Sequence, residues 1–444
     1  MTSLFKNNII KGTLILTIAS ILARIIGFYN RIFLCNLFGE REMGIFQMIL
    51  PIYMVVFSFC CQGIQTGLTR QIARIDESDI LSKRSLLRYA ILISLLASIL
   101  CSLIIHCSAD YISVHILHAT ECIRCLKLLI YAFPFVTIKG CFIGYFIGIQ
   151  KSGVSAFSQL IEQAAKILSV FLIAGYITGN PPKAYFALYG VICGEFFSCM
   201  FMIICYIIHI RKQLNLHPQT NNIKKTRLIR PLVSDAVPLT ANRLSITFLQ
   251  SFESILIPNM LCMYLDNGNA SLILYGTLTG LVLPCIMFPT TLTSALSTML
   301  LPAISSEHAS ESNEKLKMMI KKSIYFCSGI GIASTTFLLL FGKWAGNVIL
   351  SSETAGELLF QFAFLCPFIY LSACLSSIMN GLGKAGTNLI FSIICSGIRI
   401  AFILILVPLV GLKGYMWGLM TSYLLQTFLL LSVIYKSTRS KKLS

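Results

Sequence analysis

Apolar runs of about 20 residues or more follow one another along the whole chain, and each can cross a bilayer as a helix. Twelve can be placed in the 444 residues: 10–35, 44–69, 86–108, 124–149, 155–177, 185–209, 232–259, 271–301, 322–342, 357–382, 386–410 and 414–435. Only 12% of the residues are charged and mean hydropathy is +0.81, whereas about 25% of the residues in a soluble domain are charged. The sequence therefore predicts an all-α polytopic membrane protein without a separate soluble domain.

Basic residues are concentrated in alternate loops. Of the 35 lysines and arginines, 23 lie in the tails and in every second loop, 6 in the other loops and 6 inside the predicted spans. Because cytoplasmic loops carry such an excess of positive charge, we expect the loops at 70–88, 210–230 and 303–322 and both termini in the cytoplasm. The net charge of +18 then faces anionic lipids and not nucleic acid. The pattern predicts a multi-pass protein of the cell membrane, which we expect to be a monomer surrounded by membrane lipids.

An internal repeat divides the chain. The stretch PFVTIKGCFIGYFIGIQKSG at 134–153 aligns with PFIYLSACLSSIMNGLGKAG at 367–386. Two further pairs keep the same offset of 233 residues: Pro51 with Pro284, and Lys166 with Arg399. We predict two six-helix halves, 1–230 and 231–444, related by a pseudo-twofold axis along the membrane normal, which is an architecture of transporters. The alternative is chance similarity between apolar segments.

The first span carries two arginines, Arg24 and Arg31, and no acidic residue. They are seven residues apart and so lie on nearly the same helix face. A charge in the bilayer core is costly and persists where it faces a protein interior or a water-filled cavity, so this face predicts a cavity that attracts an anion. The alternative is that Arg31 extends to the membrane surface and that Arg24 pairs with an acid elsewhere.

The fifth span carries a polar stripe at the i, i+3, i+4 and i+7 spacing of one helix face. Its members are Gln159, Glu162, Gln163 and Lys166. Glu162 and Lys166 can pair with each other, and the stripe must face protein or water. We expect either a cavity lining, with Glu162 and Lys166 as binding residues, or a polar clasp between helices. Lys139 and Glu195 are further charges inside spans that can pair structurally.

The seventh span is the second-half counterpart of the Arg24 helix and is rich in polar residues. Its candidates for binding are Asn242, Arg243, Gln250 and Glu253, which cover an arc of about 100° on the helix. We expect both helices to line one central cleft. Glu253 is then either a coupling-ion or proton site or the counter-charge of an arginine. Arg399 is a further candidate because it matches Lys166 in the repeat.

No pattern indicates an enzyme. The sequence contains no Walker A, Gly-x-Ser-x-Gly or His-Glu-x-x-His motif, so we expect neither ATP hydrolysis nor a catalytic site. Cys122 and Cys125 form a lone CxxC, which is a weak signal for zinc, and most of the 17 cysteines lie inside apolar spans as small hydrophobic residues. We expect no metal and no cofactor, other than a coupling ion, H+ or Na+, that the sequence does not identify.

Four stretches carry a resemblance to a known family. They are ARIIGFYNRIFLCNLFGEREMGIFQM (23–48), GYFIGIQKSGVSAFSQLIEQAAKI (144–167), AVPLTANRLSITFLQSFESILIP (236–258) and LPCIMFPTTLTSALSTMLLPAIS (283–305). They resemble the stage V sporulation protein B branch of the multidrug/oligosaccharidyl-lipid/polysaccharide exporter superfamily. The resemblance extends over both halves and implies a MATE-like transporter fold and a flippase-like transporter of lipid-linked saccharides, associated with peptidoglycan precursors of the spore cortex.

The related lipid II flippases line a central cationic cavity with arginines of the first helix. Arg24 looks like one of those arginines, whereas the position of another holds Asn30 here, with Arg31 beside it. The lipid II flippases have fourteen helices, the last two of which form a groove for the lipid tail. Because we place only twelve spans, this resemblance does not extend to the groove.

Three functions remain open. The first is a flippase for a polysaccharide or peptidoglycan precursor linked to undecaprenyl pyrophosphate, whose phosphates suit arginines because guanidinium is always charged and binds oxygens bidentately. The second is an ion-coupled multidrug exporter of the same fold, for which an acidic cavity would be expected. The third is a non-transporting scaffold of cell-wall assembly, against which the intramembrane charges argue. The sign of the cavity charge favours the flippase.

Overall fold

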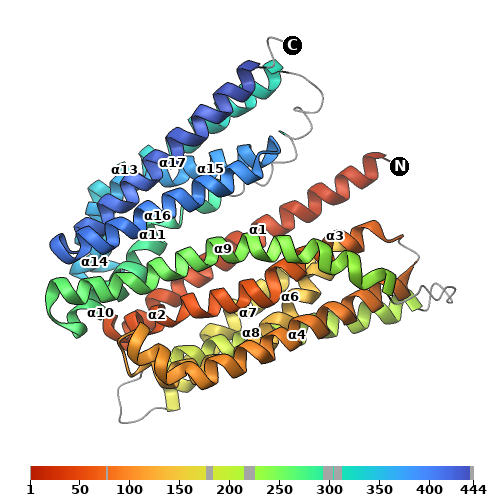
Figure 1. Cartoon of the computed structure of the whole chain (residues 1–444), viewed down its shortest axis with the longest axis horizontal. Coiled ribbons are helices and arrows are strands. Elements are labelled where there is room, and N and C mark those ends of the chain that lie inside the picture. The colour runs from red at the N-terminus through yellow and green to blue at the C-terminus, as the bar shows by residue number, and fades with distance from the viewer. Residues whose placement is uncertain are drawn as a thin grey trace. The chain divides into compact units, whose positions relative to one another are not determined.

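The computed structural model describes residues 2–76, 79–176, 184–214, 226–293, 304 and 313–440. Its α-helices are α1 (Thr2–Phe38), α2 (Glu40–Phe57), α3 (Gly63–Arg74), α4 (Ile80–Tyr111), α5 (Cys122–Leu129), α6 (Ala132–Gly148), α7 (Ser152–Tyr176), α8 (Ala184–Leu214), α9 (Thr226–Leu265), α10 (Gly268–Gly276), α11 (Leu283–Met287), α13 (Asn313–Val348), α14 (Glu353–Phe362), α15 (Cys366–Gly381), α16 (Ala385–Val410) and α17 (Leu412–Ser440) (Figure 1). The π-helical turns η1 (Ser58–Gln62) and η3 (Thr277–Val282) join α2 to α3 and α10 to α11, η2 (Ile112–Ile116) extends α4, and the 3-10 turn η4 (Ala363–Leu365) joins α14 to α15.

The described residues contain no strand. Eleven of their helices are long and apolar enough to cross a membrane, or twelve if α5 and α6, which are bent by 41°, form one span. The prediction of an all-α polytopic protein with about twelve spans is confirmed.

Several helices extend beyond the apolar runs that predicted them. Helix α4 begins at Ile80, six residues before the predicted span at 86–108. Asp79 caps this helix, since its side chain accepts a 3.0 Å hydrogen bond from the backbone N–H of Ser82. The basic residues of the predicted loop at 70–88 therefore lie partly on the first turns of α4, where a helix can leave the apolar layer without losing its backbone hydrogen bonds.

By its internal contacts the chain forms two compact units. Unit 1 comprises Met1–Phe38 and Ile45–Ser251, and unit 2 comprises Gly39–Gly44 and Phe252–Ser444. The division falls inside α9, a single long helix that contributes its first part to unit 1 and its last part to unit 2 (Figure 1). The halves predicted from the repeat, 1–230 and 231–444, and their pseudo-twofold relation stay a prediction.

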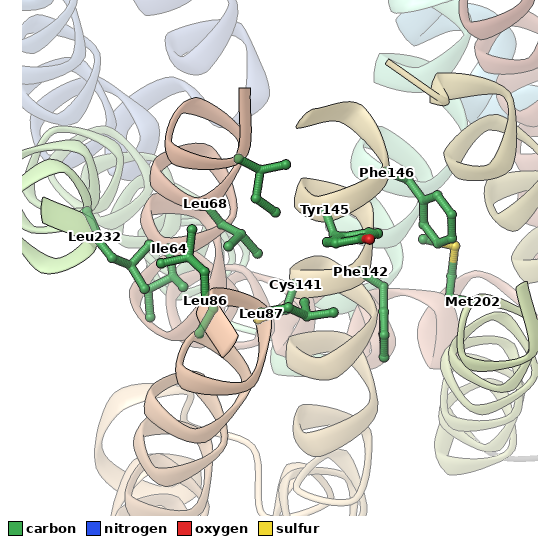
Figure 2. Close-up of a cluster of buried hydrophobic side chains, with 13 residues drawn as sticks. Ile64, Leu68, Leu86, Leu87, Cys141, Phe142, Tyr145, Phe146, Met202 and Leu232 are labelled. Atoms are coloured by element: carbon green, nitrogen blue, oxygen red, sulfur yellow. The ribbon is translucent and has the colours of Figure 1, made fainter. Parts of the chain in front are cut away.

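Close packing in unit 1 depends on glycines. On α6, Gly140, Gly144 and Gly148 recur every fourth residue and face η1 and α3: a Cβ on Gly144 would come within 2.6 Å of the backbone oxygen of Gln65. Lipid is as apolar as the side chains, so helices in a membrane associate through such close approach and not through a hydrophobic driving force. Around this contact lies a cluster of buried side chains that includes Tyr145 (Figure 2).

Unit 2 has helix pairings that match those of unit 1. In unit 1, α4 packs on α6, α6 on α8 and α7 on α8; in unit 2, α13 packs on α15, α15 on α17 and α16 on α17. The core of unit 2 is formed by residues of α13, α15 and α17, among them Cys327, Cys374, Leu375 and Leu430.

Two turns repeat at the offset of the sequence repeat. Gln150 (φ 60°) and Gly383 (φ 76°), 233 residues apart, both adopt the left-handed conformation after α6 and α15. In each case the next residue, Lys151 or Lys384, donates its backbone N–H to the carbonyl five residues earlier at 2.8 and 3.0 Å, which is the Schellman ending of a helix. His118 (φ 51°) and Ser351 (φ 54°) form a second such pair. The sequence repeat thus has a counterpart in backbone geometry.

Candidate functional site

Helix α1 carries its arginines at the edge of the face that packs against α7. The hydroxyl of Ser20 on this face donates a 3.4 Å hydrogen bond to Oε1 of Gln159. At 100° per residue, Arg24 and Arg31 lie within about 40° of Ser20 around the helix. Arg24 is exposed and Arg31 half-buried, and among the described residues neither has a hydrogen-bond or ion-pair partner. The acidic partner considered for Arg24 is therefore not found in the described part of the chain.

Asn30 lies on the buried side of α1. It is 8% exposed, and its Oδ1 has no hydrogen-bond partner among the described residues. A buried carbonyl oxygen without a donor costs about 1–3 kcal/mol. Asn30 is therefore the candidate on α1 with unused capacity to accept a hydrogen bond, whereas Arg24 supplies the donors.

Four charged side chains of unit 1 form one buried network across α6, α7 and α8. Lys139 Nζ contacts Oε2 of Glu162 at 2.9 Å and also an oxygen of Glu195. Lys166 Nζ lies 2.5 Å from Oε1 of the same Glu162. The hydroxyl of Tyr53 on α2 donates a 2.9 Å hydrogen bond to Glu195. Two ammonium groups thus face two carboxylates, and the network is electrically balanced.

The network bears on the two interpretations of the stripe on α7. The pairing expected between Glu162 and Lys166 is present, and Lys139 and Glu195, noted in the sequence only as single charges, connect it to two neighbouring helices. Their side chains are 7% and 2% exposed, against 15% and 18% for Glu162 and Lys166. A balanced, hydrogen-bonded set of this kind fixes helices relative to one another, and its more accessible end, Glu162 with Lys166, is the part that can face a cavity.

Unit 2 has its own buried ion pair, between Glu253 on α9 and Arg399 on α16. Arg399 Nε lies 3.1 and 3.0 Å from the two oxygens of Glu253. Its other nitrogens donate to the hydroxyls of Ser422 at 3.2 Å and Ser396 at 3.1 Å. Tyr415 donates a 3.3 Å hydrogen bond to Glu253. Of the two roles open for Glu253, this geometry favours the counter-charge of an arginine.

The other candidates of the seventh span lie on the part of α9 that belongs to unit 1. Asn242, Arg243 and Gln250 are all exposed. Arg243 has no side-chain hydrogen bond or ion pair among the described residues, whereas Asp235, further back on α9, accepts a 2.7 Å hydrogen bond from Gln71. Like Arg24, Arg243 is thus a cation inside a membrane span without a described counter-charge. That the two line one cleft stays a prediction.

The charged site candidates therefore fall into two kinds. Glu162 with Lys166, and Glu253 with Arg399, are tied into buried ion pairs. Arg24, Arg31 and Arg243 are arginines left without a described partner. Within the ranges that the structure describes, no group of three or more His, Cys, Asp or Glu side chains is placed to hold a metal ion.

A family profile and several individual proteins match this chain. The profile described as "Polysaccharide biosynthesis protein" matches residues 9–308. Stage V sporulation protein B of Bacillus subtilis (strain 168) is 24% identical over 440 residues, which covers 97% of this chain and 84% of that protein. Lipid II flippase MurJ of the same organism is 21% identical over 433 residues, or 92% of this chain and 78% of that protein.

Among solved structures, an outward-facing multidrug resistance MATE family transporter of the MOP superfamily superposes with a TM-score of 0.68 at 13% identity. The match covers 99% of this chain and 97% of the transporter. At this identity the likeness concerns the fold alone, and it confirms the MATE-like fold expected from the sequence.

Proposed function

The chain belongs to the polysaccharide biosynthesis protein family, and we propose that it is a flippase that moves a lipid-linked, anionic saccharide precursor across the cell membrane. The match to a protein named a lipid II flippase, over 92% of this chain, supports lipid-linked substrates as the class. The match to a stage V sporulation protein over 97% of the chain supports a precursor of the peptidoglycan or spore cortex type.

The observation that carries the proposal is the state of the arginines on α1 and α9. Arg24 and Arg243 are exposed, lie inside membrane spans and have no described counter-charge. A guanidinium facing lipid tails is too costly to keep, so such a group faces a water-filled cavity or its ligand. Helix α1 contains no acidic residue, and its surroundings therefore attract an anion. A pyrophosphate linkage is an anion that guanidinium groups bind bidentately.

The arginines without a described partner and the buried ion pairs then have different tasks. Arg24 and Arg243, with Arg31, Asn30, Asn242 and Gln250 near them on the same helices, hold the polar head of the substrate. The network on α6, α7 and α8 and the pair of Glu253 with Arg399 keep helices of each unit together, so that each moves as a body during alternating access. A gradient of H+ or Na+ supplies the driving force.

The multidrug exporter and the assembly scaffold each predict an outcome for Arg24 that differs from that of the flippase. Each positive charge in a cavity that selects cationic drugs weakens binding of the drug, so removing Arg24 would improve transport by such an exporter. A scaffold needs no intramembrane cation at all, and removing Arg24 would leave its function unchanged.

A complementation assay tests the proposal. In cells that depend on this protein, its removal is expected to make a lipid-linked saccharide accumulate on the cytoplasmic leaflet. Arg24→Ala should fail to relieve the accumulation, and Arg24→Lys should relieve it partly because an ammonium group lacks the bidentate geometry. Lys413→Ala, which removes an exposed basic residue at the start of α17, is the control. Full activity of Arg24→Ala at normal abundance in the membrane would overturn the proposal.

A further inference from the structure

Unit 1 contains an apolar pocket of about 400 Å³. Its lining comes from α2, the π-helical turn η1, α4 and α9, with Val55, Phe59, Cys101, Leu244, Ser245 and Phe248 among the side chains. A volume of this size lies within the range of small-molecule sites. The residues assigned above to the polar head of the substrate are not among these side chains, so the pocket has another occupant or holds another part of the same one.

Contacts within unit 1 fix the elements around the pocket. The hydroxyl of Ser58 in η1 lies 3.4 Å from that of Thr247 on α9. In the same turn, Sγ of Cys60 lies 3.7 Å from Sγ of Cys101 on α4. A π-helical turn is rare and often marks a functional site, and this one contacts both α4 and α9. The pocket therefore cannot close by a shift of either helix unless these contacts break.

The lining offers a ligand little to hydrogen-bond. The hydroxyl of Ser245 donates a 2.8 Å hydrogen bond to the carbonyl of Ala241 on its own helix, and the Cys101 thiol contacts that of Cys60. The other lining side chains are those of valine, leucine and phenylalanine. Sites for polar molecules contain a few polar groups that fix the orientation of the ligand. This lining instead suits a hydrocarbon.

The pocket is level with the middle of the three spans that line it. These spans are Glu40–Arg74, Ile80–Ile116 and Pro231–Leu265, whose central residues are 57, 98 and 248. Each lining side chain is within four residues of one of these centres, which corresponds to about 6 Å along a helix. The occupant must therefore be a hydrocarbon that reaches the middle of the membrane.

Chain length distinguishes the two kinds of hydrocarbon chain that such a membrane contains. The hydrocarbon core is about 30 Å thick, so each leaflet contributes about 15 Å. The acyl chain of a phospholipid starts at the surface and ends near the centre, where it offers only its last carbons. The polyprenyl chain of a lipid carrier is longer than one leaflet and continues through the centre. The position of the pocket therefore favours a polyprenyl chain.

The substrate proposed above would bring such a chain to α9. Arg243 directly precedes Leu244, which lines the pocket, and lies about 100° from it around the helix. A carrier whose pyrophosphate is bound at Arg243 thus has its chain beside α9, at the level of the pocket. Because head and chain are covalently joined, binding of the head raises the effective concentration of the chain at the pocket.

We infer that the pocket holds a central segment of the polyprenyl chain of the substrate's lipid carrier. The inference rests on the proposed flippase function and adds the class of lipid that the protein accepts. Lipid tails are as apolar as the lining, so transfer from water does not drive the binding. The gain comes from contacts that the lining atoms make only when the pocket is filled. The pocket then selects carriers by the length of their chain.

One position allows the pocket to be filled without breaking a contact between helices. Ser245 is exposed and its hydroxyl bonds to its own helix, so Ser245→Trp places an indole in the pocket and keeps the packing of α9. Leu96→Trp is the matched control, since Leu96 on α4 is 67% exposed and does not line the pocket. Both variants place the same side chain at an exposed position of a membrane span.

Photo-crosslinking to the purified full-length protein in phosphatidylcholine liposomes tests the inference. The probe is undecaprenyl pyrophosphate, without saccharide, that carries a diazirine midway along its chain, and mass spectrometry locates the labelled residues. We expect labelling to concentrate on residues 55–59, on Cys101 and on residues 244–248. Excess undecaprenyl pyrophosphate should compete for this labelling, whereas the same excess of phosphatidylglycerol should not. Ser245→Trp should abolish the labelling and Leu96→Trp should retain it.

Three results would each overturn the inference: labelling spread evenly over exposed residues of the spans, equal competition by phosphatidylglycerol, or unchanged labelling of Ser245→Trp. If Ser245→Trp does not fold, competition in the wild-type protein decides. The flippase proposal fails separately, because crosslinking requires neither saccharide nor transport. Labelling of the pocket in a protein whose Arg24→Ala variant flips normally would refute the role of the arginine and keep the chain-binding pocket. Loss of flipping in Arg24→Ala together with labelling outside the pocket would do the reverse.

Discussion

Replacing Glu253 by leucine separates the two roles considered for this carboxylate. The side chains of Glu253 and Arg399 are 8% and 10% exposed. The substitution therefore leaves a buried guanidinium with no described carboxylate, beside the hydroxyls of Ser396 and Ser422 and the ring of Tyr423. Removing one member of a buried ion pair lowers the free energy of unfolding by about 3–5 kcal/mol. At about 2.1 cal/mol/K of unfolding entropy per residue, a chain of 444 residues then unfolds roughly 3–5 °C lower.

The double variant Glu253→Leu/Arg399→Met removes both charges and should recover most of that loss, because a buried pair replaced by apolar residues of similar volume is often neutral in stability. A thiol-reactive dye measures the midpoint, since buried cysteines such as Cys327 and Cys374 react only on unfolding. If Glu253→Leu unfolds at the wild-type temperature while transport loses its dependence on an ion gradient, the counter-charge assignment is wrong and Glu253 is a coupling site.

Three further outcomes are expected. Gly144→Ala should lower the unfolding midpoint and reduce abundance, because the new methyl group meets the backbone of Gln65. Gly397→Ala is the control and should do neither, because the space at its Cβ position is open. Equal midpoints for the two variants would refute the close-packing argument. Lys139→Met should lower the free energy of unfolding by about 3–5 kcal/mol, because the carboxylates of Glu195 and Glu162 then repel each other. Adding Glu195→Leu should restore part of this stability. A wild-type unfolding midpoint for Lys139→Met would show that the network contributes no stability. A cysteine placed at 220 in a cysteine-free background should resist labelling from outside intact cells; strong labelling would reverse the predicted orientation of the termini.

The helices were predictable because a membrane span needs a long stretch of predominantly apolar residues, which can be recognised in a sequence. Apolar runs of sufficient length located the spans, and a shared offset of 233 residues located the repeat, which the turns at Gln150 and Gly383 reproduce in backbone geometry. The ends of helices were not predictable in this way. Helix α4 starts at Ile80 because a cap at Asp79 and continued backbone hydrogen bonding extend it past the apolar run. Neither effect changes the hydropathy of the sequence, so hydropathy does not predict this helix end.

Side-chain partners lie beyond what a single sequence contains. The charges at Lys139, Glu162, Lys166 and Glu195 were each visible, and the i, i+4 pair on α7 followed from spacing alone. That Lys139 joins both carboxylates depends on how α6, α7 and α8 pack, and that Tyr53 donates to Glu195 depends on α2 as well. No pattern marks Tyr53, because one hydroxyl in an apolar span is common.

The most direct test of the central claim is a flipping assay with the purified protein in liposomes. The substrate is a fluorescent saccharide linked to undecaprenyl pyrophosphate, and the matched probe is the same saccharide joined to undecaprenol without phosphate. A membrane-impermeant quencher reports how much of each probe has crossed. We expect the protein to accelerate crossing of the pyrophosphate-linked saccharide and not of the neutral one, and Arg24→Ala to slow it at least about tenfold, as the loss of charge-assisted hydrogen bonds implies. Equal acceleration of both probes, or undiminished flipping by Arg24→Ala, would contradict the claim that an arginine-lined cavity selects an anionic lipid-linked saccharide.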